Sequence, residues 1–308
     1  MTALGSNLRD YLQVRRRLGF DLRNDERLLQ GFVEFLERAG AKRVTTDLAL
    51  MWAKLPVDAR PYTWRQRLGI VRGFARYLAT IDPASEVPSK DLLPAQYVRV
   101  TPHIYSRAEI AALMGAAGAL TPAPRAATYE TLIGPLAATG LRPGEALGLD
   151  RQDVDLRGGA LHVRAAKQQK QREVPLHQST TDALRKYARV RDRRWSTPQT
   201  PAFFLNASAG RLSRSEFNHR FAKLTAQAGL EGRGARPRPR PHDLRHSFAV
   251  RTLLGWYRTG EDIDRQMPLL CTYLGHVNPA STYWYLSAAP ELMGLVGERL
   301  DRVLGGQP

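Results

Sequence analysis

A stretch punctuated by prolines divides this chain into two unequal parts. Residues 81–103 contain four of them, Pro83, Pro88, Pro94 and Pro102, and show no regular spacing of apolar side chains. Proline fixes φ and removes a backbone donor, so such a stretch favours extended backbone. We predict a first domain at residues 1–97, a linker at 98–105 and a second domain at 106–308. With 308 residues, each domain can bury its own core.

The residues before this stretch have the apolar spacing of four short helices. The apolar faces are predicted at Leu8, Tyr11, Leu12 and Leu18; at Leu28, Leu29, Phe32, Phe35 and Leu36; at Leu48, Met51, Trp52 and Leu55; and at Trp64, Leu68, Val71, Phe74 and Leu78. Gly40 and Pro56 are expected to end the second and third helices, and Thr46 to cap the third. Arginines surround the fourth apolar face. The first domain is therefore predicted to be a small all-helical domain with basic faces.

The second domain mixes helix signals with a small region of strand pattern. The Ser-x-x-Glu sequences at 106–109 and 213–216 have the capping-box spacing that marks a helix start. Between them, residues 160–164 and 172–176 have the pattern of two strands joined by a polar turn, and residues 202–205 are a candidate for another strand. The predicted fold class is mainly α with a small antiparallel β-sheet.

The charge of the chain restricts its partner. Forty-six Lys and Arg residues against 29 Asp and Glu give a net charge of +17, while 43% of residues are apolar, as in an ordinary globular protein. A folded chain this basic is expected to bind a polyanion such as nucleic acid. An arginine-tolerant proteome would give the same excess without that partner.

Two further features bear on the compartment. The single cysteine, Cys271, excludes an intramolecular disulfide and is expected to be a small buried apolar residue. The opening residues lack the pattern of a signal peptide, and no stretch is long enough to cross a bilayer. The sequence therefore predicts a soluble, cytoplasmic protein with no membrane partner.

Four motifs in the second domain contain the side chains needed to break and rejoin a phosphodiester. They are Ala-Thr-Gly-Leu-Arg142-Pro-Gly-Glu145, Ala-Ala-Lys167-Gln-Gln-Lys170, Pro-His242-Asp-Leu-Arg245-His246, and Tyr-Leu-Gly-His276 followed nine positions later by Tyr285. Arginine can hold two phosphate oxygens with its planar fork and stays charged. His242 and Arg245 lie three positions apart, so on a helix they share one face.

The order and local settings of these residues resemble the tyrosine recombinase (phage integrase) family. The resemblance implies a role for each position: Arg142 and Arg245 hold the scissile phosphate, Lys167 protonates the leaving 5′-oxygen, His242 accepts or shares the proton of the nucleophile, His276 donates to the phosphate, and Tyr285 attacks phosphorus to leave a 3′-phosphotyrosine. Glu145, one turn after Arg142, is expected to orient its guanidinium. Neither a cofactor nor a metal is required by this chemistry.

The same resemblance implies the partners and the outcome. A family member would act on double-stranded DNA as a homo-tetramer on paired sites, with possible sister recombinases, and would integrate, excise or transpose a mobile element. Residues 290–304 have the spacing of a terminal helix. Relatives dock such a tail onto a neighbouring protomer, and burial within its own chain is the alternative. The segment between Arg245 and His276 is longer than in compact members and could reshape the helices before His276.

Several alternatives remain open from sequence. Tyr283 competes with Tyr285 and Lys170 with Lys167, whereas His246 is expected to be structural, packing beside Phe248. A zinc-protease reading of the two histidines in His-Asp-Leu-Arg-His lacks the glutamate that such a site needs. A type IB topoisomerase would share the chemistry without pairing two sites, and a non-catalytic DNA-binding regulator would not need the six residues at all.

Overall fold

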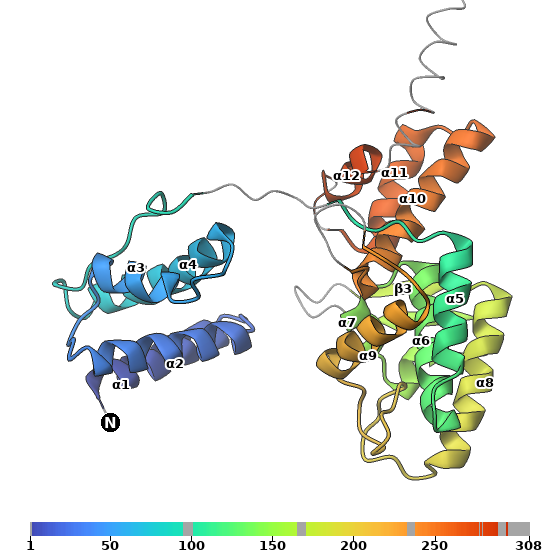
Figure 1. The fold of residues 1–308 in the computed structure, drawn as a ribbon, viewed down its shortest axis with the longest axis horizontal. Coiled ribbons are helices and arrows are strands. Elements are labelled where there is room, and N and C mark those ends of the chain that lie inside the picture. Colours follow the sequence, from blue (N-terminus) through green and yellow to red (C-terminus); the bar gives the residue numbers. More distant parts are fainter. Residues whose placement is uncertain are drawn as a thin grey trace, which may run out of the picture. The chain divides into compact units, whose positions relative to one another are not determined.

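The computed structural model describes residues 2–94, 101–164, 171–232, 238–276, 278, 280–288 and 294 (Figure 1). The chain splits into two compact units, Met1–Arg99 and Val100–Pro308. Each unit has its own buried core. Lys167 and the predicted tail at 290–304, apart from Gly294, lie outside the described residues.

The N-terminal unit contains the four predicted helices: α1 (Ala3–Arg17), α2 (Arg23–Arg38), α3 (Thr46–Lys54) and α4 (Pro61–Ala79). Their apolar faces meet in one core, in which the rings of Phe32 and Trp52 lie 5.2 Å apart. Arg67 stacks its guanidinium 3.7 Å from the Trp52 ring and donates to the Trp52 carbonyl. The core thus reaches the surface beneath a charged side chain.

Details of this unit differ from the sequence prediction. Leu18 and Leu55 are exposed because each is the residue at which its helix ends. Met51 is exposed because it falls on the opposite side of α3 from the buried face, which is formed by Ala49, Trp52 and Ala53. The cap of α3 is Thr45, not Thr46: its side chain accepts from the Leu48 amide at 3.3 Å.

The proline-punctuated stretch begins as part of the N-terminal unit. Arg72 donates to the carbonyls of Pro88 and Ser89 at 2.8 and 2.9 Å, and Leu93 is buried in the core. Residues 82–94 are therefore held against the N-terminal unit, because α4 supplies donors and an apolar surface for them. Residues 102–105 belong to the C-terminal unit, where the Tyr105 amide donates to Ser247 at 2.7 Å.

The C-terminal unit is mainly helical, as predicted, with a small antiparallel sheet. Its helices are α5 (Arg107–Gly118), α6 (Ala123–Thr139), α7 (Pro143–Gly148), the 3-10 turn η1 (Arg151–Asp153), α8 (Gln178–Arg194), α9 (Arg214–Gln227), α10 (Pro241–Thr259), α11 (Ile263–Leu274) and α12 (Ala280–Ala288). Helix α6 contacts both α5 and α8. The capping box at Ser106 and Glu109 is present, and Ser213 caps α9 by accepting from the Glu216 amide.

The sheet has three strands in the order β1 (Val154–Asp155), β2 (Ala160–Val163) and β3 (Arg172–Pro175). Strands β2 and β3 are the predicted pair, with Val163 opposite Arg172. Strand β1 was not predicted, since two residues are too short to show a pattern. Residues 202–205 do not join this sheet. They make isolated bridges to Asp150 and Arg211, and their apolar side chains fill the core.

Helices α10, α11 and α12 lie together (Figure 1). Their buried side chains form a second apolar cluster in this unit. The longer segment after Arg245 extends α10 to Thr259, and Gly260, with φ of 76°, ends the helix in the left-handed conformation before α11 begins. Cys271 is buried in this cluster, as expected. None of the described helices is long and apolar enough to span a membrane.

Candidate active site

Arg142 lies at the start of α7, presented by a tight turn. Gly140 ends α6 with φ of 62°, and a Cβ at this position would lie 2.6 Å from the Phe248 ring, so only glycine fits. The predicted contact with Glu145 is present. Its Oε1 accepts from Arg142 Nη1 at 2.8 Å, and its Oε2 from the Arg142 amide at 2.9 Å. Arg142 Nη2 donates to the Gly275 carbonyl at 3.0 Å, which ties α7 to the turn after α11.

Arg245 occupies the buried side of α10, and only 1% of it is exposed. Its Nη1 donates to the Gly140 carbonyl at 2.8 Å and its Nη2 to the Leu274 carbonyl at 2.7 Å. Burial and then the charge of Arg142 lower the pKa of Arg245 to about 10, whereas Tyr285 and Glu145 act in the opposite direction. Arg245 therefore stays cationic at neutral pH and lies within electrostatic reach of both Arg142 and Tyr285.

A third arginine that the sequence did not single out completes this group. Arg172, the first residue of β3, donates from Nη1 and Nη2 to the two oxygens of Glu145 at 3.0 and 2.8 Å. Burial alone would raise the pKa of Glu145, but the hydrogen bonds and charge of Arg172 and the bonds from Arg142 lower it to about 2. Two guanidinium groups thus bind one carboxylate, and Arg245 adds a third positive charge nearby, which leaves surplus positive charge for an anion.

The two candidate histidines are neutral at pH 7. His242 lies at the start of α10, and burial followed by the charge of Arg245 lowers its pKa to about 4. His276 follows Gly275, which ends α11 with φ of 66°, and the same two causes lower its pKa to about 3. Both imidazoles therefore respond to the same cationic centre.

Tyr285, on α12, points into this group, whereas Tyr283 does not. Tyr285 is 2% exposed, and its ring lies 6.0 Å from the His276 ring at an interplanar angle of 26°. Tyr283 is 44% exposed. Helix geometry explains the difference, since residues two apart on a helix face different directions.

Four segments thus bring together five of the six residues singled out in the sequence: Arg142, His242, Arg245, His276 and Tyr285. The sixth, Lys167, and its competitor Lys170 lie outside the described residues. Strand β2 precedes their segment and β3 follows it, and Arg172, the first residue of β3, contacts Glu145 in the site.

Two residues next to this group have surroundings that the sequence did not reveal. The ring of His246, predicted to be structural, makes edge contacts with those of His242 and Tyr285, at 4.9 and 5.4 Å. One turn of helix separates it from His242, which explains this placement. Thr282 is fully buried, and its hydroxyl lies 2.6 Å from His276 Nδ1. Its position three residues before Tyr285 was the available signal.

Comparison with known proteins assigns this arrangement to a family. Residues 105–291 match the model of the phage integrase family. The chain belongs to that family of tyrosine recombinases. The Sinorhizobium fredii protein named "Putative integrase/recombinase y4rB" is 41% identical over 308 residues, which cover 98% of each chain.

Two solved structures show the fold that this integrase family member shares. The XerH site-specific recombinase bound to palindromic difH substrate matches with a TM-score of 0.64 and 18% identity, over 91% of this chain and 77% of that one. The Tn1549 transposon integrase in complex with a circular intermediate DNA matches with a TM-score of 0.64 and 16% identity, over 96% and 99%. Membership of this family makes the chain a DNA recombinase enzyme.

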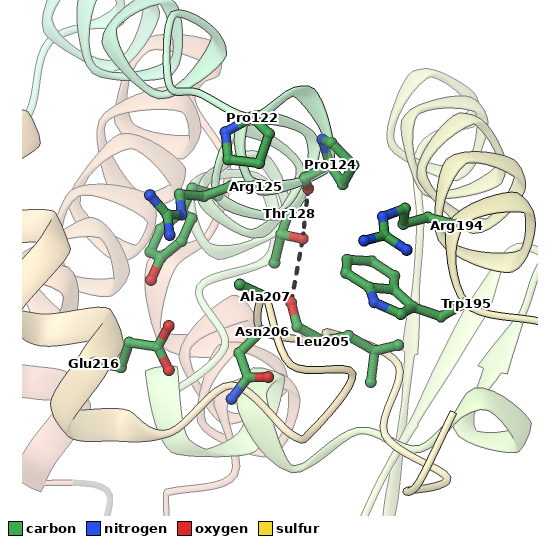
Figure 2. Close-up of a pocket in the computed structure, with 11 residues that line it drawn as sticks. Pro122, Pro124, Arg125, Thr128, Arg194, Trp195, Leu205, Asn206, Ala207 and Glu216 are labelled. Carbon is green, nitrogen blue, oxygen red and sulfur yellow. Dashed lines mark hydrogen bonds between the residues drawn. The ribbon is translucent and has the colours of Figure 1, made fainter. Parts of the chain in front are cut away.

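A cavity shown in Figure 2 lies apart from the candidate site of this integrase family member. It has a volume of about 50 Å³ and opens between the start of α6, at Pro124 and Arg125, and the end of α8, at Arg194 and Trp195. None of the candidate catalytic residues lines it. A cavity this small does not suit a duplex, so the cationic group described above is the better candidate.

No described group of three or more His, Cys, Asp or Glu side chains is arranged to hold a metal ion.

Asp243 stands where a zinc protease would have its glutamate in the sequence His-Asp-Leu-Arg-His. Its carboxylate accepts from the amide of Arg240 at 2.8 Å. It therefore caps α10 and does not lie free to act as a general base.

The two neutral histidines predict a pH dependence of stability. Unfolded imidazoles protonate near pH 6.5, whereas folded His242 and His276 stay neutral down to about pH 4 and 3. Above pH 6.5 the folded and unfolded states bind equal numbers of protons at these groups. As the pH falls from about 6.5 to 4, the unfolded state binds more, so the folded state loses stability.

We expect the melting temperature of the wild type to drop more steeply between about pH 7.5 and 5 than that of the double variant His242→Gln, His276→Gln. Thermal unfolding without DNA measures both slopes. Equal slopes would show that these imidazoles are not held neutral by the fold.

Proposed function

We propose that this recombinase cleaves and rejoins duplex DNA through a covalent link to Tyr285. The observation that supports this most is the gathering of Arg142, Arg245, His276 and Tyr285, from four separate segments, around one cationic centre. Binding alone needs no buried tyrosine at such a centre. A phosphodiester in that position would meet both a nucleophile and fixed positive charge.

The chemistry follows from the side chains. The Tyr285 oxygen attacks phosphorus and passes its proton to neutral His242 as the bond from phosphorus to the 5′-oxygen breaks. The 5′-oxygen takes a proton from Lys167, and the products are a 3′-phosphotyrosine and a 5′-hydroxyl. Rejoining runs the same steps backward with a 5′-hydroxyl as the nucleophile, so the bond energy is kept and no water or nucleotide is consumed.

Arg142 and Arg245 stabilise the charge that develops on the non-bridging oxygens. That charge grows in the transition state, so fixed guanidinium groups bind the transition state more strongly than the ground state. Both side chains are already held by carbonyl and carboxylate partners, so little reorganisation is needed. The bound phosphate would also replace water that now solvates the exposed part of Arg142, whose side chain is 38% exposed.

His276 would donate to the phosphate from Nε2, and Thr282 would select the required tautomer. The Thr282 oxygen accepts from Cys271 Sγ at 3.0 Å, so its own proton is available for His276 Nδ1 at 2.6 Å. A ring that accepts at Nδ1 has its proton on Nε2.

We expect Thr282→Val to slow the formation of the covalent adduct about tenfold, because the imidazole can then turn or change tautomer. Thr282→Ser keeps the hydroxyl and should restore most of the rate. Adduct formation at saturating DNA measures both. Wild-type rates in Thr282→Val would show that the hydroxyl does not set the state of His276.

The experiment that tests the proposed chemistry uses a nicked suicide substrate. The short 5′-hydroxyl strand diffuses away after cleavage, so a covalent enzyme cannot rejoin the DNA and accumulates. We expect the wild type to form a protein–DNA adduct that survives denaturant, with chelator present throughout. No adduct on the DNA ends of its own element would contradict the proposal.

We also propose a paired assembly on a mobile element. Support comes from the relatives: a solved neighbour is a transposon integrase with a circular intermediate DNA, and another is a recombinase bound to its palindromic substrate. Four copies would pair two duplex sites and exchange two strands at a time through a four-way junction, with or without sister recombinases. The basic N-terminal domain would bind the same duplex, so affinity should fall steeply with salt.

A further inference from the structure

All three guanidinium nitrogens of Arg172 donate hydrogen bonds within the candidate site. Its Nε donates to the Tyr273 carbonyl at 2.9 Å, and its fork holds both oxygens of Glu145. Its side chain is largely buried. A Cβ at Gly275 would lie 2.8 Å from Arg172 Nη1, so the missing side chain of Gly275 makes room for this guanidinium.

These contacts close a ring of hydrogen bonds. Glu145 holds Arg142, Arg142 donates to the Gly275 carbonyl, and Arg172 joins Glu145 back to the Tyr273 carbonyl two residues away. Three segments are tied together in this way: the start of α7, the start of β3 and the end of α11. A bidentate pair fixes the plane of the Glu145 carboxylate, which a single contact would leave free to rotate.

Because Arg142 and Arg172 share the carboxylate of Glu145, Arg172 also affects how much positive charge Arg142 can offer to a phosphate. With Arg172 present, one carboxylate is divided between two guanidinium groups, so Arg142 keeps part of its charge for a phosphate. Without Arg172, Glu145 would pair with Arg142 alone, turn toward it and neutralise it.

We propose that Arg172 is a positioning residue for catalysis. It holds Glu145 so that Arg142 is oriented toward the scissile phosphate and keeps part of its positive charge for it. This inference rests on the proposed function. Arg172 itself need not touch DNA. Arg172 also begins the strand that follows the segment with Lys167. An effect of Arg172 on that segment is therefore a second route, which experiment has to distinguish from the route through Arg142.

The first test compares Arg172→Gln with Arg211→Gln. Arg211 is a matched control, since it too lies close to α7 and donates to the carbonyls of Leu147 and Leu149 and to the carboxylate of Asp150. We expect Arg172→Gln to slow adduct formation at saturating DNA about tenfold or more, with DNA affinity nearly unchanged. Arg211→Gln should lose a similar amount of thermal stability and keep its rate. Equal rates in both variants would overturn the proposal.

A double-mutant cycle tests the route through Glu145. If Arg172 acts through that carboxylate, Arg172→Gln combined with Glu145→Gln should be no slower than the slower single variant. Multiplied effects on the rate would show that Arg172 acts elsewhere, which would overturn the proposal. Arg172→Lys should remain slow, because an ammonium cannot hold both oxygens in a plane.

A substrate with sulfur in place of the bridging 5′-oxygen distinguishes an effect on the segment with Lys167 from an effect through Arg142. A thiolate leaves without a proton, since thiols are far more acidic than alcohols. If Arg172 acts through Arg142, Arg172→Gln should stay slow on this substrate. Recovery to the wild-type rate would overturn the proposal and assign the effect to the segment with Lys167.

Wild type and Tyr285→Phe run beside these variants keep the two claims distinct. If the wild type forms no adduct, or Tyr285→Phe still forms one, the proposed function fails whatever Arg172 does. If both behave as proposed and Arg172→Gln matches the wild type, only the inference about Arg172 fails.

Discussion

Replacing Tyr285 with phenylalanine is expected to abolish the covalent adduct and leave DNA binding intact. The loss should be about 10⁴-fold or more, since the variant lacks the attacking oxygen and the chemistry offers no substitute. Phenylalanine keeps the ring that stacks near His276, so the fold should persist. Denaturing gels measure the adduct, and a titration with labelled duplex measures affinity.

Tyr283→Phe is the matched control, two residues away on the exposed side of α12. It should form adduct at nearly the wild-type rate. The reverse result, with Tyr283 essential and Tyr285 dispensable, would mean that α12 rotates about its axis when DNA binds. A DNA-binding regulator would be unaffected by either change, and a topoisomerase would lose plasmid relaxation in Tyr285→Phe while never joining two sites.

The second large effect is expected at the two arginines. Arg142→Lys and Arg245→Lys should each slow cleavage at saturating DNA about 10²- to 10³-fold, because an ammonium cannot present the planar fork. The variants should differ in stability. Arg245→Lys leaves the buried carbonyls of Gly140 and Leu274 poorly satisfied, at a cost of about 1–3 kcal/mol, whereas Arg142 is partly solvated and should cost less.

Comparing the two arginine variants separates chemistry from folding. Single-turnover cleavage and thermal unfolding are measured on the same samples. If the rates fall only in proportion to lost stability, with Arg142→Lys nearly normal, the guanidinium groups are structural. The proposal that Arg142 and Arg245 stabilise the charge on the phosphate would then be wrong.

The fold class followed from local patterns because those patterns are strong here. The four N-terminal helices, the capping box at Ser106 and the pairing of β2 with β3 each follow from spacing within a few residues. Local patterns miss structure that depends on tertiary contacts. Residues 82–94 have no periodicity of their own, yet α4 supplies partners for them, and β1 exists only because β2 lies beside it.

The candidate site also contains residues that local motifs indicate and residues that only tertiary contacts reveal. Arg142, Arg245, His276 and Tyr285 stand in motifs that identify them individually, although their meeting depends on how α7, α10, α11 and α12 pack. Arg172 is one arginine among many in the sequence, and nothing local distinguishes it. Its role depends on contacts with Glu145 and Tyr273, which are 27 and 101 positions away.

The central claim is that Tyr285 attacks the phosphodiester, and mapping the trapped adduct tests it most directly. Adduct from a suicide substrate is digested with nuclease and protease, and the modified peptide is sequenced by mass spectrometry. We predict a nucleotide joined through its 3′-phosphate to Tyr285. A modification on Tyr283, on Ser281 or through a 5′-phosphate would contradict the account.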